Sequence, residues 1–482
     1  MLYNFVKGGK MKKHNLLKVL LITILLVMIG TWTLSITGVS SGEFVTQDGT
    51  AVGLFSVSNF FLIALSYFGH VALFVLAIGG LYGVLHKIPQ YRVLLDKIVK
   101  GFNGLEWLFM IIIGIIFSLL SSMVGMSIVL LLLFPFVISI ILLMGYDKIT
   151  AIMLTVGSTI AGLIGSVFSA NDVFGITDVL SSFGETASSH VGFKIVLLCV
   201  SLAIVLINTI LYARKHRNVE STEALNCVPE KVETKNKTIY PIIVVLDILL
   251  IVLGLAFFSW DLFENTFFTD ITSSFIKTGE GSVFLCEILN KVLGISSGTS
   301  FGSWSLLEGA LVVTLAGYLL SLCYRKKFTD FLTDFGNGAK RAIYPALLIV
   351  MSYTVLVTVT NVPIQLTLVK SIINLGTESP QIIVMCIVAI VFSLFAVESY
   401  YSVNAAGYYI LAVTTAKTAG LSALIWQSMY GLTMLFAPTS VILISTLAYT
   451  DVSYGKWLKA AWKLLLELFM AIFIILFIFN AR

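Results

Sequence analysis

Long apolar stretches separated by short polar or basic segments make up most of the chain. Neither their length nor their lack of alternation fits the short strands of an outer-membrane barrel. A helix crosses the hydrocarbon core with roughly 20 apolar residues, so we expect about nine transmembrane helices, plus two re-entrant hairpins and two broken helices. Continuous spans are predicted near 16–36, 60–85, 193–212, 239–258, 306–323, 343–360 and 456–479.

Two apolar runs are interrupted near their middle by polar residues. The run 105–144 is interrupted at 121–127, and the run 382–416 at 398–404. Each is either two full spans or one re-entrant hairpin. We favour hairpins, because pairs of full spans would place basic loops on opposite sides of the membrane.

Two further segments combine an apolar helix with glycine, proline and hydroxyl residues. Segment 151–172 contains Gly165-Ser166, and segment 421–447 contains Pro438-Thr439-Ser440. We predict that both helices are broken within the membrane. The order of helix, interrupted run, broken helix and final helix therefore occurs twice, which predicts two inverted repeats in an all-α polytopic membrane protein.

This repeat divides the chain into residues 1–213 as a first membrane half, 214–238 as a cytoplasmic linker and 239–482 as a second half. The polar stretch 40–50 and the long loop 261–303 are expected outside, and an interfacial helix is expected near 87–100.

Composition agrees with the pattern, because 58% of the 482 residues are hydrophobic and 11% are charged, against about 25% charged in a soluble domain. The net charge of +5 comes from basic residues in short loops beside apolar runs. They indicate topology rather than nucleic-acid binding. We expect a multi-pass protein of a prokaryotic cytoplasmic membrane, surrounded by the lipid bilayer, with its N-terminus inside.

Several activities lose support because their motifs are absent. The sequence lacks GxxxxGK[ST] and HExxH patterns, and its five cysteines show no CxxC spacing. An ATPase, a metalloprotease and a metal or disulfide framework are therefore not expected. We predict that the chain is not an enzyme and needs no organic cofactor.

The four interruptions are the places where a solute could bind. Backbone that leaves a helix inside the bilayer must face protein or a water-filled cavity. Helix N-termini there favour carboxylates, and hydroxyl, amide and carbonyl oxygens can coordinate Na⁺. Candidate ligands are Ser127, Ser158, Thr159, Ser169 and Asn171 in the first half, and Glu398, Ser399, Ser402, Asn404, Thr433, Thr439 and Ser440 in the second. Ser158, Asn171, Asn404 and Thr439 are the candidate Na⁺ ligands, with H⁺ as the alternative coupling ion.

A plainer interpretation applies to each of these residues, since Ser, Thr and Gly are common packing residues between membrane helices. Taken singly, packing is the commoner role, whereas four clusters together favour a site. Glu398 is the most notable acid, because an ionised group at membrane depth is costly and tends to be functional. Glu398 and Asp172 would instead be solvated if their segments reach the surface.

Short motifs give a resemblance over most of the chain. They are Gly79-Gly80-Leu81-Tyr82-Gly83-Val84-Leu85, Gly125-Met126, Gly145-Tyr146-Asp147, Gly165-Ser166, and Pro438-Thr439-Ser440 followed by Tyr454-Gly455-Lys456-Trp457-Leu458-Lys459. The chain resembles the C4-dicarboxylate anaerobic carrier family of the ion transporter superfamily, which includes members described as basic amino acid or arginine/ornithine antiporters.

By position, the resemblance implies roles for Gly125, Met126, Ser166, Pro438, Thr439 and Ser440. The chain also departs from the family pattern. Ile128-Val129 stands where the family usually has a Glu pair, and Ser169-Ala170 where it has Asn-Pro.

We therefore expect a secondary transporter for a small organic anion or amino acid, a carboxylate-containing solute that includes dicarboxylates and short peptides. Transport would be coupled to Na⁺ or H⁺, or proceed by exchange. Resemblance to the superfamily implies an elevator motion of one bundle against a scaffold, and a homodimer. One rival is a non-transporting receptor or subunit, suggested by the missing acid pair. A membrane-embedded enzyme is a weaker rival, because no nucleophile–base pair is visible.

Overall fold

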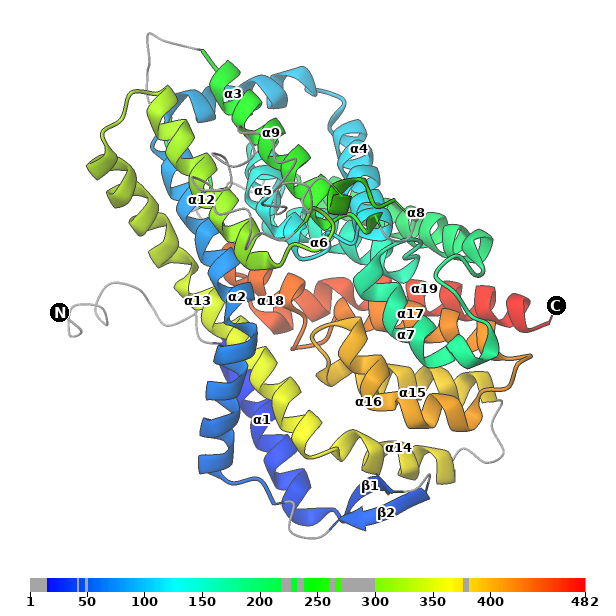
Figure 1. Cartoon of the computed structure of the whole chain (residues 1–482). Coiled ribbons are helices and arrows are strands. Elements are labelled where there is room, and N and C mark those ends of the chain that lie inside the picture. The colour runs from blue at the N-terminus through cyan, green and yellow to red at the C-terminus, as the bar shows by residue number, and fades with distance from the viewer. Residues whose placement is uncertain are drawn as a thin grey trace, which may run out of the picture.

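The computed structural model describes residues 15–40, 43–47, 51–217, 227–231, 238–260, 265–270, 300–375 and 381–481. These residues are almost entirely helical (Figure 1), which confirms an all-α polytopic membrane protein. Eight helical segments among them are long and apolar enough to cross a membrane. They are α1 (Asn15–Thr33), α2 (Leu54–His86), α4 (Glu106–Leu119) with the π turn that follows it, α8 (Val191–Lys215), α9 (Tyr240–Phe257), α12 (Leu306–Cys323), α13 (Phe328–Asn361) and α19 (Tyr454–Asn480).

A small antiparallel hairpin of two strands interrupts the helical pattern after α1. Strands β1 (Ile36–Ser40) and β2 (Glu43–Gln47) pair with each other. Strand β2 lies in the stretch 40–50 that was expected to be a polar external segment, and β1 directly precedes it. The Thr37 amide donates to Thr367 Oγ1 of α14 (Ile364–Leu375) over 2.9 Å. The hairpin and α14 lie together at the lower end of the molecule in Figure 1.

Helices α2 and α13 run side by side for much of their length (Figure 1). Their backbones come into direct contact, because a Cβ added at Gly338 would lie 2.6 Å from Gly83 Cα. Helix α13 begins at residue 328, so the prediction of a span starting near 343 was wrong by four turns. The extra turns carry charged residues, among them Asp334, which pairs with Lys326 over 2.7 Å.

Helix α3 (Pro89–Gly101) has the predicted amphipathic character. It buries Tyr91, Leu94 and Leu95 and keeps basic residues on its other face, where Arg92 pairs with Asp96 over 2.9 Å. This pattern is typical of a helix that lies in the membrane interface.

The first interrupted run contains α4, a π turn (Leu120–Val124), a 3₁₀ turn (Val129–Leu132) and α5 (Phe134–Leu143). Arg217, after α8, joins its two ends. Its guanidinium pairs with Glu106 at the start of α4 over 3.0 Å and lies 5.9 Å from the ring centre of Tyr146, which follows α5. Both ends of the run therefore meet beside Arg217, as a re-entrant hairpin requires.

The second interrupted run forms α15 (Gln381–Phe395) and α16 (Ser399–Val413). Gln381 Nε2 donates to the Val413 carbonyl over 3.0 Å, so the first residue of α15 meets the last residue of α16. The break covers only residues 396–398. Ser399, Ser402 and Asn404 belong to α16, not to a polar tip as the sequence suggested.

The two broken helices are α6 (Lys148–Ile164) with α7 (Ala170–Leu180), and α17 (Ala419–Met434) with α18 (Val441–Thr450). The expected end of the first at 172 was wrong, since α7 continues to residue 180 and includes Asp178. Helix α6 begins beside the end of α8, where Tyr212 Oη donates to Asp147 over 3.3 Å. Helix α17 begins beside the start of α8, where Gly420 packs on His190. The two therefore run in opposite directions, as inverted repeats require.

The predicted linker 214–238 is only partly a linker. Helix α8 continues to Lys215, and residues 227–231 pack against the protein. Ser139 Oγ of α5 donates to the Cys227 carbonyl over 2.8 Å, and Arg92 Nη1 of α3 donates to Pro229 over 3.0 Å. The rest of the linker and most of loop 261–303 lie outside the described residues.

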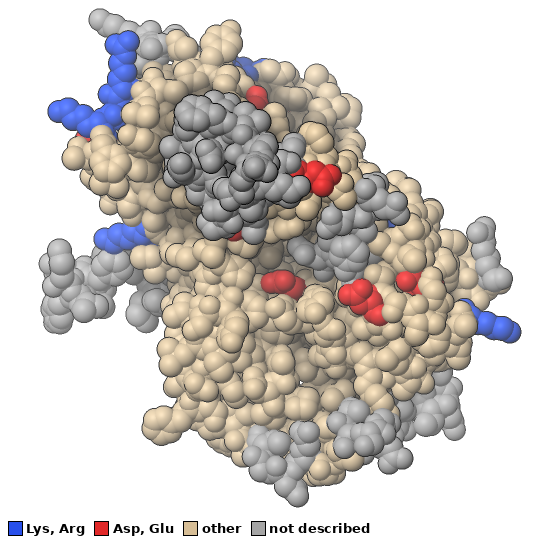
Figure 2. All heavy atoms as spheres, in the orientation of Figure 1, with Lys and Arg blue, Asp and Glu red and all other residues tan. Residues whose placement is uncertain are grey.

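Charged residues are sparse on the face seen in Figure 2, where lysine and arginine side chains lie at the edges of the molecule. Exposed large apolar side chains cover α1, α8, α9, α12 and α19. Such a surface is suited to contact with lipid acyl chains.

Candidate functional site

A cavity of about 180 Å³ lies where the hairpin tips meet the broken helices. Both halves contribute to it: Gly125 and Ser127 come from the first tip, Glu398 from the second, and Ser440 from the second break. Helices α2, α9 and α12 close it from the other side. The remaining lining residues are His70, Ile128, Val129, Leu163, Phe257, Trp304, Ser305, Leu306, Val397, Tyr430, Met434, Val441 and Ile442.

Ser122 attaches the first hairpin to the first break. Its Oγ donates to the Gly165 carbonyl over 2.7 Å. Its own carbonyl accepts from the amides of Val167 and Phe168, at 3.0 and 3.1 Å. Backbone groups freed where α6 ends are thus paired inside the protein, as a break within a membrane requires.

Thr439 and Tyr430 attach the second hairpin to the second broken helix. Thr439 Oγ1 donates to the Leu394 carbonyl over 2.8 Å. Tyr430 Oη donates to the Val397 carbonyl over 3.1 Å. The carbonyls that the chain frees between α15 and α16 therefore also find buried donors.

The two broken helices contact each other directly beside the cavity. Gln427 Nε2 of α17 donates to the Ser166 carbonyl in the first break over 2.7 Å. A Cβ added at Gly431 would lie 2.6 Å from the backbone nitrogen of Ile164, so no side chain separates the two helices there. Glycine is required for so close an approach.

Glu398 is held by a tyrosine of the α2–α13 pair. Tyr353 Oη of α13 donates to Glu398 Oε1 over 2.5 Å. The Tyr353 ring stacks on Phe68 of α2, with centroids 4.2 Å apart. His70, two residues further along α2, also lines the cavity. Among the described lining residues, Glu398 is the one acid and His70 the one basic side chain.

The start of α18 opens on the cavity. Ser440 is the N-cap of α18, and residues 440–442 line the cavity. The Leu443 amide donates to Ser440 Oγ over 3.4 Å, and the helix dipole favours a negative group beside this end of the helix. Facing them, Gly125 takes a left-handed conformation (φ 72°) at the end of the π turn, where a side chain would be strained.

Four of the predicted site residues line the cavity together: Gly125, Ser127, Glu398 and Ser440. Thr439, Ser166 and Ser169 lie at the breaks but are not lining residues. Thr439 binds the hairpin, the Ser166 carbonyl accepts from Gln427, and Ser169 caps α7 close to Gly125. Pro438 lies in the second break, between α17 and α18.

The other predicted residues do not line the cavity. Ser158 and Thr159 lie inside α6 rather than at the break, and Thr159 Oγ1 donates within the helix to the Thr155 carbonyl. Thr433 likewise bonds within α17. Ser402 Oγ lies 3.1 Å from Ser393 Oγ and joins the two arms of the second hairpin. Ser399 lies in the first turn of α16, and Asn404 is exposed.

The Na⁺ site proposed from Ser158, Asn171, Asn404 and Thr439 stays a prediction. The Asn171 side chain, like that of Asp172, lies outside the described residues. Ser158 packs beside Gly114 of α4, whereas Thr439 lies at the second hairpin. The described part of the chain contains no group of three His, Cys, Asp or Glu side chains that could hold a metal ion.

Sequence reasoning missed three polar side chains of the site: His70, Tyr353 and Tyr430. All three lie inside long apolar helices, where a single ring among aliphatic residues looks like packing. A histidine within the apolar helix α2 was the one usable signal, because ionisable residues in membrane helices tend to be functional.

Three comparisons with known proteins find similarities. The family model for "DcuC: C4-dicarboxylate anaerobic carrier" matches residues 44–480. A protein of Escherichia coli (strain K12) named "Putative basic amino acid antiporter YfcC" is 24% identical over 454 residues, which cover 90% of this chain and 78% of that one. The crystal structure of the Alcanivorax borkumensis YdaH transporter aligns with a TM-score of 0.43 and 14% identity, over 96% of this chain and 97% of that one.

Proposed function

Because the chain belongs to the C4-dicarboxylate anaerobic carrier family and is a multi-pass membrane transporter, we propose that it is a secondary active transporter. Its central cavity would bind a small carboxylate-containing solute. The observation that carries the proposal is the lining of the cavity by both hairpin tips and by the start of α18. A solute carboxylate would bind at the α18 N-terminus, beside Ser440.

Glu398 favours an amino acid over a dicarboxylate among the possible solutes. Its carboxylate would pair with an amino group of the solute, while the helix terminus takes the carboxylate of the solute. A second solute carboxylate would instead lie near Glu398 with no lysine or arginine among the described lining residues to pair with it. The name of the Escherichia coli relative, a basic amino acid antiporter, points to the same class.

Coupling is proposed to use Na⁺ or H⁺, or exchange against a second solute. Glu398 is the group best placed to carry a proton, since it opens on the cavity and pairs with Tyr353. For motion we propose an elevator in the cytoplasmic membrane. The α2–α13 pair would form the fixed scaffold, and the bundle built from α4–α8 and α15–α19 would carry the cavity.

The test compares Glu398→Gln with the wild type in proteoliposomes. Glutamine keeps the size and an acceptor for Tyr353 but removes the charge. We expect uptake or exchange of basic and neutral amino acids to fall at least about tenfold, as loss of a charged contact of about 1.4 kcal/mol or more predicts. Wild-type rates in Glu398→Gln would refute the role of Glu398.

Glu467→Gln is the matched control, since Glu467 lies in α19, accepts from Asn208 Nδ2 over 2.5 Å and does not line the cavity. It should transport at close to the wild-type rate. Assays with an Na⁺ gradient, with a pH gradient and with internal solute alone separate the three forms of coupling. If dicarboxylates alone are transported, the amino-acid proposal fails while the transporter assignment stands.

A further inference from the structure

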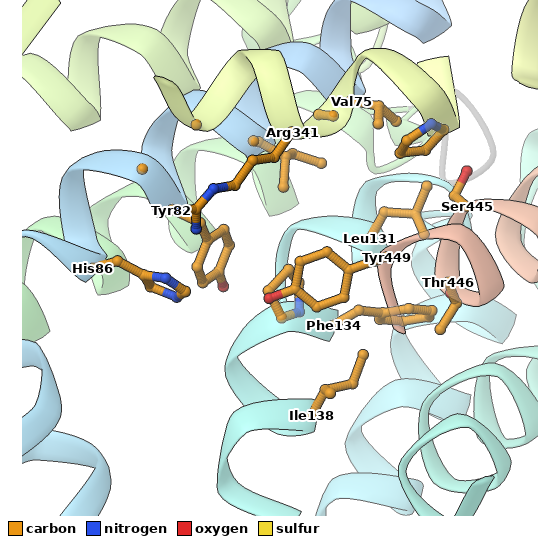
Figure 3. A pocket seen from close by; sticks show the side chains of 17 residues that line it. Val75, Tyr82, His86, Leu131, Phe134, Ile138, Arg341, Ser445, Thr446 and Tyr449 are labelled. Atoms are coloured by element: carbon orange, nitrogen blue, oxygen red, sulfur yellow. The ribbon is translucent and has the colours of Figure 1, made fainter. Parts of the chain in front are cut away.

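A second cavity lies apart from the central one, between the α2–α13 pair and the helices α5 and α18. Its volume is about 90 Å³. Figure 3 shows Tyr82 and His86 projecting from α2, Arg341 extending from α13 toward them, and Ser445, Thr446 and Tyr449 projecting from α18. None of its lining residues belongs to the central cavity.

Most of the wall of this second cavity is apolar. Val75, Leu131, Phe134 and Ile138 line it, and its basic residues are Arg341 and His86. Arg341 is exposed at the surface and forms no ion pair within the described residues. Asp334, two helical turns earlier on α13, is already paired with Lys326.

Three buried polar atoms face this cavity without a hydrogen-bond partner among the described residues: His86 Nε2, Ser445 Oγ and Tyr449 Oη. The hydroxyls can donate, and so can the imidazole in the matching tautomer. Burial of such groups without partners costs about 1–3 kcal/mol each. Three donors beside an arginine that has no acid partner therefore call for a ligand with several acceptor oxygens and a negative charge.

The His86 end of this cavity is expected at the depth of the lipid headgroups, because the neighbouring helix α3 has the amphipathic pattern of an interfacial helix. His86 is the last residue of α2, and its ring stacks on Tyr91 of the interfacial helix α3, with centroids 6.0 Å apart. Val75, at the other end of the lining, is eleven residues earlier, or about 16 Å along the helix axis. The His86 end is thus expected at the interface, and the end near Val75, where Ser445 also lies (Figure 3), is deeper.

We propose that this cavity binds the phosphate headgroup and first acyl carbons of an anionic phospholipid. Arg341, His86 and Tyr449 bind the phosphate oxygens, Ser445 on the far side of the cavity (Figure 3) binds a glycerol ester oxygen, and the apolar wall formed by α5 and α2 contacts the first carbons. The volume accommodates this part of a lipid alone, so the rest of the chains lie outside among the bilayer lipids. A lipid bound there bridges the scaffold pair and the bundle that carries the central cavity.

Native mass spectrometry of the delipidated full chain tests the site. The protein is titrated with phosphatidylglycerol, with phosphatidylcholine of identical acyl chains, and with glycerol phosphate or succinate as soluble anions. We expect one tightly held phosphatidylglycerol, bound at least about tenfold more tightly than phosphatidylcholine. Arg341→Gln should weaken phosphatidylglycerol binding about tenfold, and Ser445→Ala a few-fold.

Arg325→Gln is the matched control, because Arg325 is exposed on the turn after α12 and does not line the cavity. It should bind phosphatidylglycerol like the wild type. Equal affinity of the wild type for both lipids, or unchanged binding in Arg341→Gln, would overturn the proposal. Displacement of the lipid by succinate or glycerol phosphate at millimolar concentration would also overturn it, in favour of a soluble anion. None of these outcomes depends on the transport assay.

Discussion

Tyr353 and Glu398 join the scaffold pair to the tip of the second hairpin. The hydroxyl of Tyr353 donates to Glu398 Oε1 over 2.5 Å, while its ring stacks on Phe68. The acid that the sequence marked as most notable is therefore positioned by a helix from outside its own hairpin. Any movement of the hairpin relative to α13 must break this bond, which makes it a contact specific to one conformation.

Replacing Tyr353 with phenylalanine isolates that bond, because phenylalanine keeps the stack on Phe68. A hydrogen bond to a charged group contributes about 1.5–3 kcal/mol, so we expect Tyr353→Phe to lower transport about tenfold or more and to lower the free energy of unfolding by about that amount. Uptake rates and melting curves in detergent measure the two effects. Tyr401→Phe, a neighbouring ring that packs edge-on against Phe68, should behave like the wild type. Equal effects of the two variants would contradict a specific role for Tyr353.

The contact between α2 and α13 predicts strongly different effects for two glycines of α13. A Cβ at Gly338 would collide with the backbone of Gly79 and Gly83, whereas a Cβ at Gly336 meets nothing within 4 Å. Gly338→Ala should therefore destabilise the protein by about 1–3 kcal/mol, as overpacking does. Gly336→Ala should be neutral or stabilise by up to about 1 kcal/mol through helix propensity. Melting curves of both variants measure this difference in stability. Similar stabilities would mean that α2 and α13 do not pack as described.

The docked segment 227–231 predicts slow chemistry at Cys227. Burial raises the pKa of the Cys227 thiol to about 11, and the thiolate is the reactive form. Its alkylation should be at least about tenfold slower at pH 8 than that of Cys323, which is exposed at the end of α12. The Cys227 rate should also keep rising as the pH increases toward 11. Single-cysteine variants labelled with a maleimide between pH 7 and 9 measure this, and equal rates would show that the segment is not docked.

Hydrophobic length predicted the continuous spans well, because about 20 apolar residues leave a helix few alternatives inside a bilayer. It failed for α13, because the charged residues in the first four turns of this helix look like those of a loop. Hairpins and breaks were found from polar interruptions, although the interruption 398–404 was read as a tip when its last six residues continue the helix α16. Period and composition mark where a helix can break, but packing decides the residue at which it does.

The site was predictable only in part for a related reason. Gly125, Ser127, Glu398 and Ser440 stand at breaks in the pattern, and these four line the cavity. Ser158 and Ser402 have the same chemistry but lie against other helices, and nothing in the local sequence distinguishes them. His70 and Tyr353 come from helices distant along the chain, so only the tertiary structure brings them to the cavity.

The crossing of α6 and α17 limits how the cavity can be emptied. Because Gly431 lets the two backbones touch, and Gln427 ties α17 to the first break, the two repeats are fastened to each other at the cavity itself. A motion that opened the cavity between the two repeats would have to break this contact in every transport cycle. This junction supports the proposal that the cavity releases its solute by moving as one unit with both repeats, rather than by opening between them.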